Sequence, residues 1–303
     1  MSLRAPAPAD FSGLWIPLVT PFREGRIDHD ALAALCRRLA AQGIAGFVVC
    51  GSTGEAAALD DAEQLAVLHT VAAAAPQLPR LFGVGGWHLG QVLDKVRRLA
   101  GQGLAGLLVP APSYVRPPQA GLVDWFVRIA DASDVPLLVY DIPYRTGATL
   151  ALDTLLALAG HPRIAGLKDC GGDAAKTRAL IADGRLQVLA GEDAQAFATV
   201  AEGGAGAIAA AAHVHTARWV RLVALLRAGR LHEARALWQP LAPLVQALFA
   251  EPNPAPLKAL LARHGEIADG LRLPMTPASS TLAQRLAMLD VELPGLDARE
   301  SRP

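Results

Sequence analysis

The segment Arg163-Ile164-Ala165-Gly166-Leu167-Lys168-Asp169 ends a short apolar run in a lysine, and a Gly-Gly turn follows at residues 171–172. This pattern is typical of a buried strand whose last side chains reach the rim of a core. Burial disfavours the ammonium form, so it lowers the pKa of a lysine and makes the amine a nucleophile. Bringing the ordinary pKa of ~10.4 near 7 requires roughly 3 pKa units, on the order of 4 kcal/mol. The alternative is a lysine with a buried stem and a charged head that reaches water.

The chain has four lysines, and their surroundings differ. Lys95, in QVLDKVRRLA, and Lys176, in DAAKTRAL, are predicted on the exposed faces of amphipathic helices. Lys258 follows a proline-rich segment that leads into another helix. Only Lys168 ends the pattern of a buried strand, which makes it the candidate nucleophile.

Strand-then-helix units repeat on both sides of this segment. The apolar strands are expected at residues 14–19, 44–50, 81–84, 104–109, 136–140, 163–169, 186–190 and 206–210. The helices are expected at residues 31–42, 60–75 (with Asp60 or Asp61 as the start), 88–101, 120–132, 152–159, 173–182, 194–202 and 213–228. Short, continuous apolar strands indicate a parallel sheet that is covered on both faces. Eight such units predict an α/β fold, a (β/α)8 TIM barrel, with a doubly wound open sheet as the alternative.

The strand signal stops after residue 228. Three further helices are expected, at residues 231–250, 256–263 and 282–289, before a short polar tail that begins at Val291. The predicted division is therefore a catalytic barrel at residues 1–228 and a C-terminal helical domain with its tail at residues 229–303.

Composition restricts the class of protein. The formal net charge is +0, the pI is about 7.1 and no basic run occurs, which argues against a nucleic-acid partner. The sequence has no uncharged run long enough to span a membrane and no apolar leader at its start. Three widely spaced cysteines, Cys36, Cys50 and Cys170, are typical of a reducing compartment. We expect a cytoplasmic protein without a disulfide framework.

In a barrel of this kind the site is built at the carboxyl ends of the strands and in the loops that follow them. The polar residues predicted there are Thr20, Ser52, Thr53, Glu55, Ser113, Tyr114, Arg116, Tyr140, Asp141, Tyr144, Arg145, Lys168, Asp169, Glu192 and Asp193. They include all three tyrosines of the chain, and tyrosine carries protons when a base or a hydroxyl lies beside it. A lysine, tyrosines, hydroxyls and arginines together suit a carbonyl substrate held as a Schiff base, with its carboxylates bound by N–H groups and a guanidinium.

Three motifs on successive strand ends resemble those of a known family. GSTGE (51–55), YDIPYRTG (140–147) and GLKD (166–169) are similar to motifs of the dihydrodipicolinate synthase / N-acetylneuraminate lyase family of class I pyruvate aldolases. The resemblance extends from residue 17 to about residue 261. Arg145 and the segment NPAPLKAL (253–260) resemble the branch of 4-hydroxy-tetrahydrodipicolinate synthases. The family fold is a (β/α)8 barrel with helices at its C-terminal end, commonly a homotetramer built from tight dimers.

The resemblance implies a role for each matching residue. Lys168 forms the Schiff base with pyruvate, and Tyr140 carries protons to and from it. Thr53 links Tyr140 to Tyr114, which reaches in from a neighbouring subunit. Ser52 and Thr53 hold the pyruvate carboxylate. We expect no cofactor other than the covalent imine between the lysine and pyruvate, and no metal ion.

Arg145 is the implied ligand for the carboxylate of the second substrate, L-aspartate semialdehyde, and Gly191 and Ile208 line the pyruvate pocket. The implied reaction is the condensation of both substrates to 4-hydroxy-tetrahydrodipicolinate, in lysine and diaminopimelate biosynthesis. Another pyruvate aldolase, a sugar-acid dehydratase and a non-catalytic ligand-binding paralogue are the alternatives.

The chain also departs from the family pattern. Ser52 replaces a threonine, and Asp141 and His213 replace asparagines, without loss of a catalytic group. His213 and His215 make a weak metal motif, because alternate residues at a helix start do not share a face. The positions that hold the lysine effector in lysine-inhibited members are Asp61, Gln64, Trp87, Gln91 and Ser113. Because these residues lack the family's effector contacts, we expect no feedback inhibition by lysine.

Overall fold

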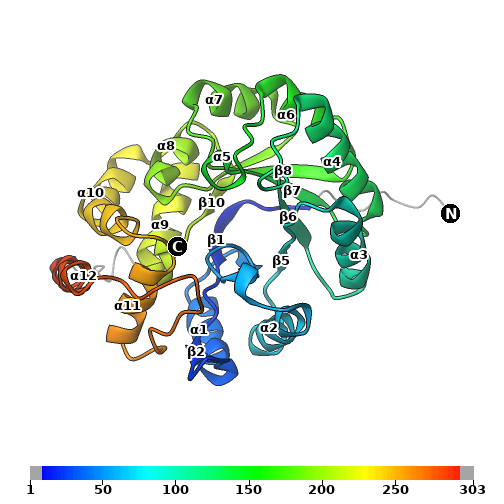
Figure 1. The fold of residues 1–303 in the computed structure, drawn as a ribbon. Coiled ribbons are helices and arrows are strands. Elements are labelled where there is room, and N and C mark those ends of the chain that lie inside the picture. The colour runs from blue at the N-terminus through cyan, green and yellow to red at the C-terminus, as the bar shows by residue number, and fades with distance from the viewer. Residues whose placement is uncertain (1–8, 294–303) are drawn as a thin grey trace.

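The computed structural model describes residues 9–293, and its centre is a closed parallel barrel (Figure 1). The barrel strands are β1 (Gly13–Pro17), β4 (Gly46–Val49), β5 (Arg80–Gly83), β6 (Gly106–Pro110), β7 (Leu137–Asp141), β8 (Ile164–Asp169), β9 (Gln187–Ala190) and β10 (Gly206–Ile208). Each strand pairs in parallel with the next, and β1 pairs with both β10 and β4. The predicted barrel is therefore confirmed, and the open sheet is wrong.

Helices alternate with the strands and surround the barrel (Figure 1). They are α1 (His29–Ala40), α2 (Asp61–Ala74), α3 (Leu89–Leu99), α4 (Gln119–Ala132), α6 (Leu152–Leu158), α7 (Ala174–Asp183), α8 (Ala196–Ala201) and α9 (Thr216–Arg227). Local chemistry sets their starts. Asp28 caps α1, Asp60 forms a capping box with Glu63 at α2, and Asp173 caps α7.

Several short elements were not predicted. They are the hairpin of β2 (Phe22–Arg23) and β3 (Arg26–Ile27), the one-turn helix α5 (Pro143–Thr146), and the 3-10 turns η1 (Ala56–Ala58), η2 (Asp193–Gln195) and η3 (Ala211–His213). Elements of two to four residues that lie outside the apolar runs of the barrel strands show no periodic pattern. The expected helix start at residue 213 is wrong, because His215 adopts a left-handed backbone with φ 50° and α9 begins after it.

The C-terminal segment is helical, as expected. It contains α10 (Leu231–Leu248), α11 (Ala255–Arg263) and α12 (Ser280–Glu292), which lie on the side of the barrel occupied by α8 and α9 (Figure 1). Apolar residues of these helices, such as Leu241 and Leu286, belong to the same buried cluster as the outer face of the barrel. A division at residue 228 stays a prediction, since one core runs across it. Helix α12 includes the first residues of the expected tail, and residues 294–303 lie outside the described part.

The interior of the barrel is filled by a second cluster that supports the site from below. Phe11, Trp15, Leu81, Leu138 and other apolar residues pack there beneath Tyr140. The Trp15 indole donates a hydrogen bond of 2.7 Å to the Phe11 carbonyl, so its polar atom is satisfied. A Cβ on Gly46 would lie 2.4 Å from the Trp15 ring, so glycine is required for the indole to fill this space.

Two of the lysines expected on exposed helix faces are not exposed. Lys176 is 6% exposed and forms an ion pair with Asp141, and Lys95 is partly buried beside Gln64. Lys258 is 0% exposed and pairs with Glu55. The expectation for Lys95 and Lys176 is wrong because each ammonium finds a partner far away in sequence, which helical periodicity does not show.

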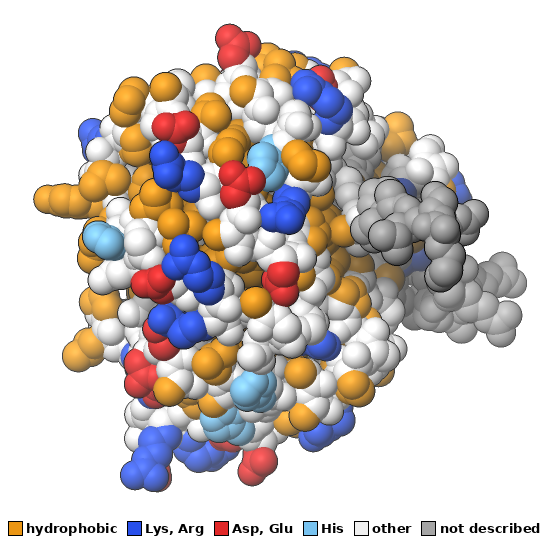
Figure 2. Space-filling model, turned by 90° about the vertical axis from the view of Figure 1, so that its right-hand side faces the viewer, with side chains coloured by type: hydrophobic (Ala, Val, Ile, Leu, Met, Phe, Trp, Pro, Cys, Tyr) orange, Lys and Arg blue, Asp and Glu red, His pale blue; other side chains and the backbone are white. Residues whose placement is uncertain are grey.

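The surface carries both signs of charge. On the face shown in Figure 2, basic and acidic side chains are interspersed among apolar ones and do not form one extended patch. Within residues 9–293, no helix combines the length and the apolar character needed to cross a bilayer.

Candidate active site

Lys168 and Tyr140 lie side by side at the carboxyl ends of β8 and β7. The two residues are partners in the strand register, and both are buried, at 5% and 7% exposure. The Lys168 Nζ donates a hydrogen bond of 3.3 Å to the Tyr140 hydroxyl and lies 4.3 Å from the centroid of its ring. The lysine head is thus inside the site, and the alternative of a head that reaches water is wrong.

Burial determines the electrostatics of this pair. Desolvation lowers the pKa of Lys168, against the opposing effect of nearby acidic groups that include Asp193 and Glu192. Desolvation also raises the pKa of Tyr140 well above its ordinary value. The pair therefore favours a neutral amine beside a protonated phenol, which are a nucleophile and a proton donor.

The GSTGE loop brings two hydroxyls to the same place. The Ser52 side chain acts on Tyr140 and lowers the pKa of that phenol against the larger effect of burial. Thr53 is buried, and its Oγ1 accepts a hydrogen bond of 3.0 Å from the Asn253 Nδ2. The two hydroxyls of the loop therefore have different partners.

The C-terminal helices support this loop from outside the barrel. Glu55, the last residue of the motif, is buried and accepts hydrogen bonds from the Lys258 Nζ and, at 3.2 Å, from the Arg272 backbone N–H. Asn253 precedes a cis peptide bond to Pro254 and lies at the start of the segment that leads into α11. The segment NPAPLKAL resembles the synthase branch, but its sequence does not predict that Asn253 reaches the site.

A cavity of about 420 Å³ opens above Lys168. It brings together seven of the eight predicted site residues: Ser52, Thr53, Tyr140, Arg145, Lys168, Gly191 and Ile208. Phe249, Glu251 and Asn253 line its outer side, so the C-terminal extension contributes to the wall.

Tyr114 is the predicted residue that this chain does not bring to the cavity. Its side chain is 91% exposed, on a loop after β6 where its backbone has φ 75°. Val115 and Trp87 are also large and exposed, at 52% and 68%. A second cavity of about 440 Å³ lies between this surface and the site and shares Ser52, Tyr140 and Arg145 with the first.

Three further polar residues line the first cavity: Tyr144, Glu192 and Asp193. They were predicted at the carboxyl ends of strands, but no role was predicted for them. The Tyr144 hydroxyl donates a hydrogen bond of 2.9 Å to the Glu192 carboxylate across the mouth. Asp193 is buried and accepts a hydrogen bond of 2.6 Å from the Ala211 N–H, and burial raises its pKa to about 7. These groups place acidic side chains around the position of an incoming substrate.

The two histidines after β10 have separate partners. The Val19 N–H donates to the His213 Nε2 at 3.3 Å, and the His213 Nδ1 lies 2.8 Å from the Ala210 carbonyl. Burial lowers the pKa of His213 to about 4, so the ring is neutral. His215 pairs with Asp290 instead. The two rings thus do not form a joint metal site.

Residues 10–289 match the model of the dihydrodipicolinate synthetase family. A 4-hydroxy-tetrahydrodipicolinate synthase of Xanthomonas axonopodis is 39% identical over 297 residues, 95% of this chain and 98% of that protein. A 4-hydroxy-tetrahydrodipicolinate synthase 2 of Clostridium acetobutylicum is 35% identical over 278 residues, 90% of this chain and 97% of that protein.

Solved structures agree with the sequence relatives. The dihydrodipicolinate synthase of Acinetobacter baumannii, in complex with pyruvate, superposes with a TM-score of 0.90 at 31% identity, covering 93% of this chain and 99% of that one. The enzyme of Thermotoga maritima superposes with a TM-score of 0.90 at 29% identity, covering 93% of this chain and 98% of that one.

Proposed function

The chain belongs to the dihydrodipicolinate synthetase family, and from this premise we infer that it is a lyase of the class I aldolase type. It condenses pyruvate with L-aspartate semialdehyde to 4-hydroxy-tetrahydrodipicolinate, a step of lysine and diaminopimelate biosynthesis. The observation that carries this function is the buried lysine at the end of β8, in hydrogen-bond contact with a phenol inside a cavity that also holds Arg145.

The first half of the reaction takes place at Lys168. The neutral amine attacks the C2 carbonyl of pyruvate and forms a carbinolamine. Tyr140 donates its proton to the departing hydroxyl, which leaves as water, and the imine results. Ser52 and Thr53 bind the pyruvate carboxylate from the GSTGE loop, and Gly191 and Ile208 close the opposite wall. The imine itself accepts the electron pair when C3 loses its proton, so the step requires no further cofactor.

The middle hydroxyl of the proton relay is better assigned to Ser52 than to Thr53. Ser52 is the hydroxyl that influences the Tyr140 phenol and lowers its pKa, whereas Thr53 receives a hydrogen bond from Asn253. Ser52 lines both cavities, so it lies between Tyr140 and the side from which Tyr114 of another copy would approach. Thr53 is assigned to substrate binding and to the contact with the C-terminal extension.

The second half of the reaction takes place nearer the mouth. The enamine carbon attacks the aldehyde of L-aspartate semialdehyde and forms the new carbon–carbon bond. Arg145 binds the carboxylate of this substrate. The substrate's amine then attacks the imine carbon and displaces Lys168, which closes the ring and frees the enzyme. One water is released in the complete reaction, from the first imine.

The assembly that we propose is a homotetramer built from tight dimers. Tyr114 is exposed in the single chain and lies beside exposed Val115, although the relay requires a tyrosine at the cavity. A second copy that covers this surface would supply the missing hydroxyl. We place the enzyme in the cytoplasm, which fits a biosynthetic reaction and three buried cysteines, Cys36, Cys50 and Cys170, without a disulfide.

Two measurements test the function. Borohydride reduction in the presence of pyruvate is expected to add a three-carbon acid to the peptide that carries Lys168. A coupled assay with pyruvate and a panel of aldehydes is expected to give the highest kcat/KM with L-aspartate semialdehyde. A label on another peptide refutes the mechanism, and a preference for an uncharged sugar aldehyde indicates a different aldolase of the family.

A further inference from the structure

The residues that follow the two catalytic side chains are both aspartates. Strands β7 and β8 pair Tyr140 with Lys168 and Asp141 with Asp169. Because side chains alternate along a strand, the first pair faces the barrel interior and the second pair faces the helical layer. Both aspartates are buried, at 1% and 4% exposure.

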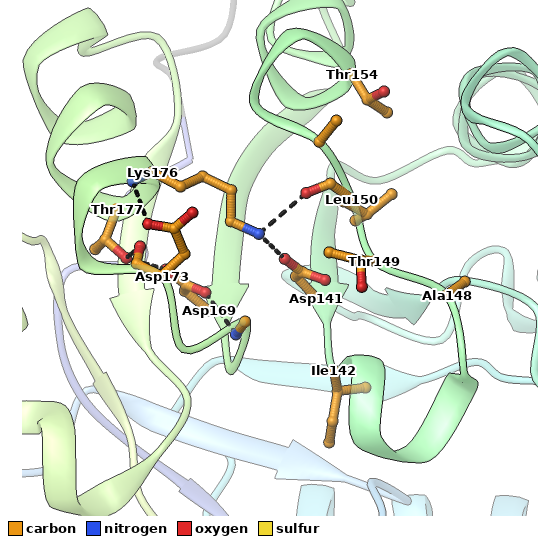
Figure 3. A network of polar contacts seen from close by, with 12 residues as sticks. Asp141, Ile142, Ala148, Thr149, Leu150, Thr154, Asp169, Asp173, Lys176 and Thr177 are labelled. Carbon is orange, nitrogen blue, oxygen red and sulfur yellow. Dashed lines mark hydrogen bonds and ion pairs between the residues drawn. The ribbon is translucent and has the colours of Figure 1, made fainter.

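Consecutive residues of α7 bind these two aspartates (Figure 3). The Lys176 Nζ lies 2.6 Å from Asp141 Oδ2 and donates a second hydrogen bond of 3.0 Å to the Leu150 carbonyl. The Thr177 Oγ1 donates a hydrogen bond of 2.5 Å to Asp169 Oδ2, whose other oxygen accepts one of 2.8 Å from the Gly171 N–H. The first turn of α7 thus holds the ends of both catalytic strands.

We propose that Lys176 is a positioning residue for imine formation. By holding Asp141 while Thr177 holds Asp169, it fixes the separation between the Tyr140 hydroxyl and the Lys168 amine, which are 3.3 Å apart. The inference rests on the proposed function, since it assigns Lys176 to the geometry of that reaction. Its contact with Leu150 also anchors the segment that follows Arg145 and α5.

The space around the ion pair is tight. A Cβ on Gly171 would lie 2.7 Å from Asp141 Oδ2 and 2.8 Å from the Lys176 Nζ, so this turn has no room for a side chain or for a displaced pair. Asp141 Oδ1 is buried without a hydrogen-bond partner among residues 9–293. A buried ion pair with an unsatisfied oxygen is a poor way to gain stability compared with apolar packing. The advantage that it provides is one defined geometry.

The pair acts through geometry and not through its electric field. Asp141 and Lys176 carry opposite charges 2.6 Å apart, so their fields largely cancel. Asp141 also lies on the face of the sheet opposite to that of Lys168. Loss of the pair is therefore expected to lower the rate of imine formation without moving its pH midpoint.

The test compares Lys176→Met with the wild type and with a matched control, Leu286→Ala, which removes a buried side chain of α12 away from the site. The rate at which pyruvate forms an imine at Lys168 is measured by borohydride trapping at 25 °C, below the unfolding transition of each variant. A displacement of about 1 Å costs on the order of 100-fold, so trapping in K176M is expected to fall about 10- to 100-fold. The KM for pyruvate and the pH midpoint are expected to stay near those of the wild type. L286A is expected to keep the wild-type rate.

A double variant provides the rescue. Asp141→Gln with Lys176→Gln removes both charges and keeps a hydrogen-bonded pair, because the side chain at position 141 gains the one bond that the side chain at position 176 loses. The trapping rate of this double variant is expected to be about tenfold higher than that of K176M. The proposal is overturned if folded K176M traps pyruvate at the wild-type rate. It is also overturned if L286A loses as much of the trapping rate as K176M does, or if the folded double variant recovers none of that rate. If K176M does not fold, Asp141→Ala, which removes the acceptor of the Lys176 Nζ, is judged by the same rate criterion. If the wild type traps no pyruvate, the proposed function itself is wrong.

Discussion

Replacing Lys258 by methionine is expected to destabilise the whole protein and to loosen the GSTGE loop. The Lys258 ammonium is 0% exposed and contacts Glu55, whose side chain is 2% exposed. It also donates a hydrogen bond of 2.9 Å to the Gly270 carbonyl and lies 4.4 Å from the centroid of the Phe22 ring. In the variant, the buried Glu55 keeps one hydrogen bond, from the Arg272 N–H, but within residues 9–293 it has no salt bridge left.

The magnitude follows from the burial of both partners. Removing one member of a buried ion pair costs about 3–5 kcal/mol, because it leaves an uncompensated charge in the core. The entropy of unfolding is about 2.1 cal/mol/K per residue, so for 303 residues a loss of 1 kcal/mol lowers the melting temperature by about 1.6 °C. The expected decrease in Tm is therefore roughly 5–8 °C.

Thermal unfolding followed by circular dichroism measures this decrease, with Glu55→Gln/Lys258→Met as the control. The double variant removes both charges, so it is expected to recover about half or more of the lost stability. A decrease below about 2 °C in K258M would refute the reasoning, because the pair would then contribute no more than an exposed one. A double variant as unstable as K258M would show that lost packing and not the stranded charge causes the effect.

Three other outcomes are expected. Arg145→Ala should leave pyruvate trapping intact and lower kcat/KM for L-aspartate semialdehyde about 10- to 100-fold, since one charge-assisted bond of about 1.5–3 kcal/mol is lost; an equal loss of trapping would contradict the role of Arg145. Lysine should not inhibit in a steady-state titration below about 1 mM, because Gln91 and Trp87 replace a carboxylate and an amide, and two lost contacts weaken binding at least roughly a hundredfold. Burial lowers the pKa of His213 from 6.5 in the unfolded chain to about 4 in the folded protein. Between these pH values only the unfolded state binds the proton, so the contribution of His213 to stability is lost as the pH falls through this window. Compared with His213→Asn, the wild type should lose about 3 kcal/mol more unfolding free energy between these pH values, and parallel denaturation curves for the two proteins would refute this.

The parts of the structure that could be predicted are those in which local sequence carries the information. Short apolar strands separated by amphipathic helices predicted the barrel, because a parallel sheet covered on both faces leaves that pattern. The end of such a strand marks the mouth of the barrel, which is why Lys168, Tyr140 and Arg145 were placed together correctly. Motif spacing added the loop that carries Ser52 and Thr53.

The parts that escaped prediction depend on contacts between distant residues. Asn253 and Thr53 are 200 residues apart, and Lys258 and Glu55 are 203 residues apart. The local sequence around a helix lysine does not show whether the lysine faces the core or the solvent. Only a carboxylate partner elsewhere in the chain distinguishes the two cases. The left-handed backbone of His215 is equally hidden, since a non-glycine residue gives no local sign of it.

The lysines at this end of the barrel show how the partner determines the role of a buried amine. Lys258 and Lys168 are both desolvated, which lowers the pKa of each. For Lys258 the contact with Glu55 opposes this effect and keeps the ion pair. Lys168 has no carboxylate within 4.0 Å in the described part of the chain, and its hydrogen-bond partner is the neutral Tyr140 phenol. Equal burial therefore produces a structural cation where a carboxylate is in contact, and a nucleophilic amine where only a phenol is.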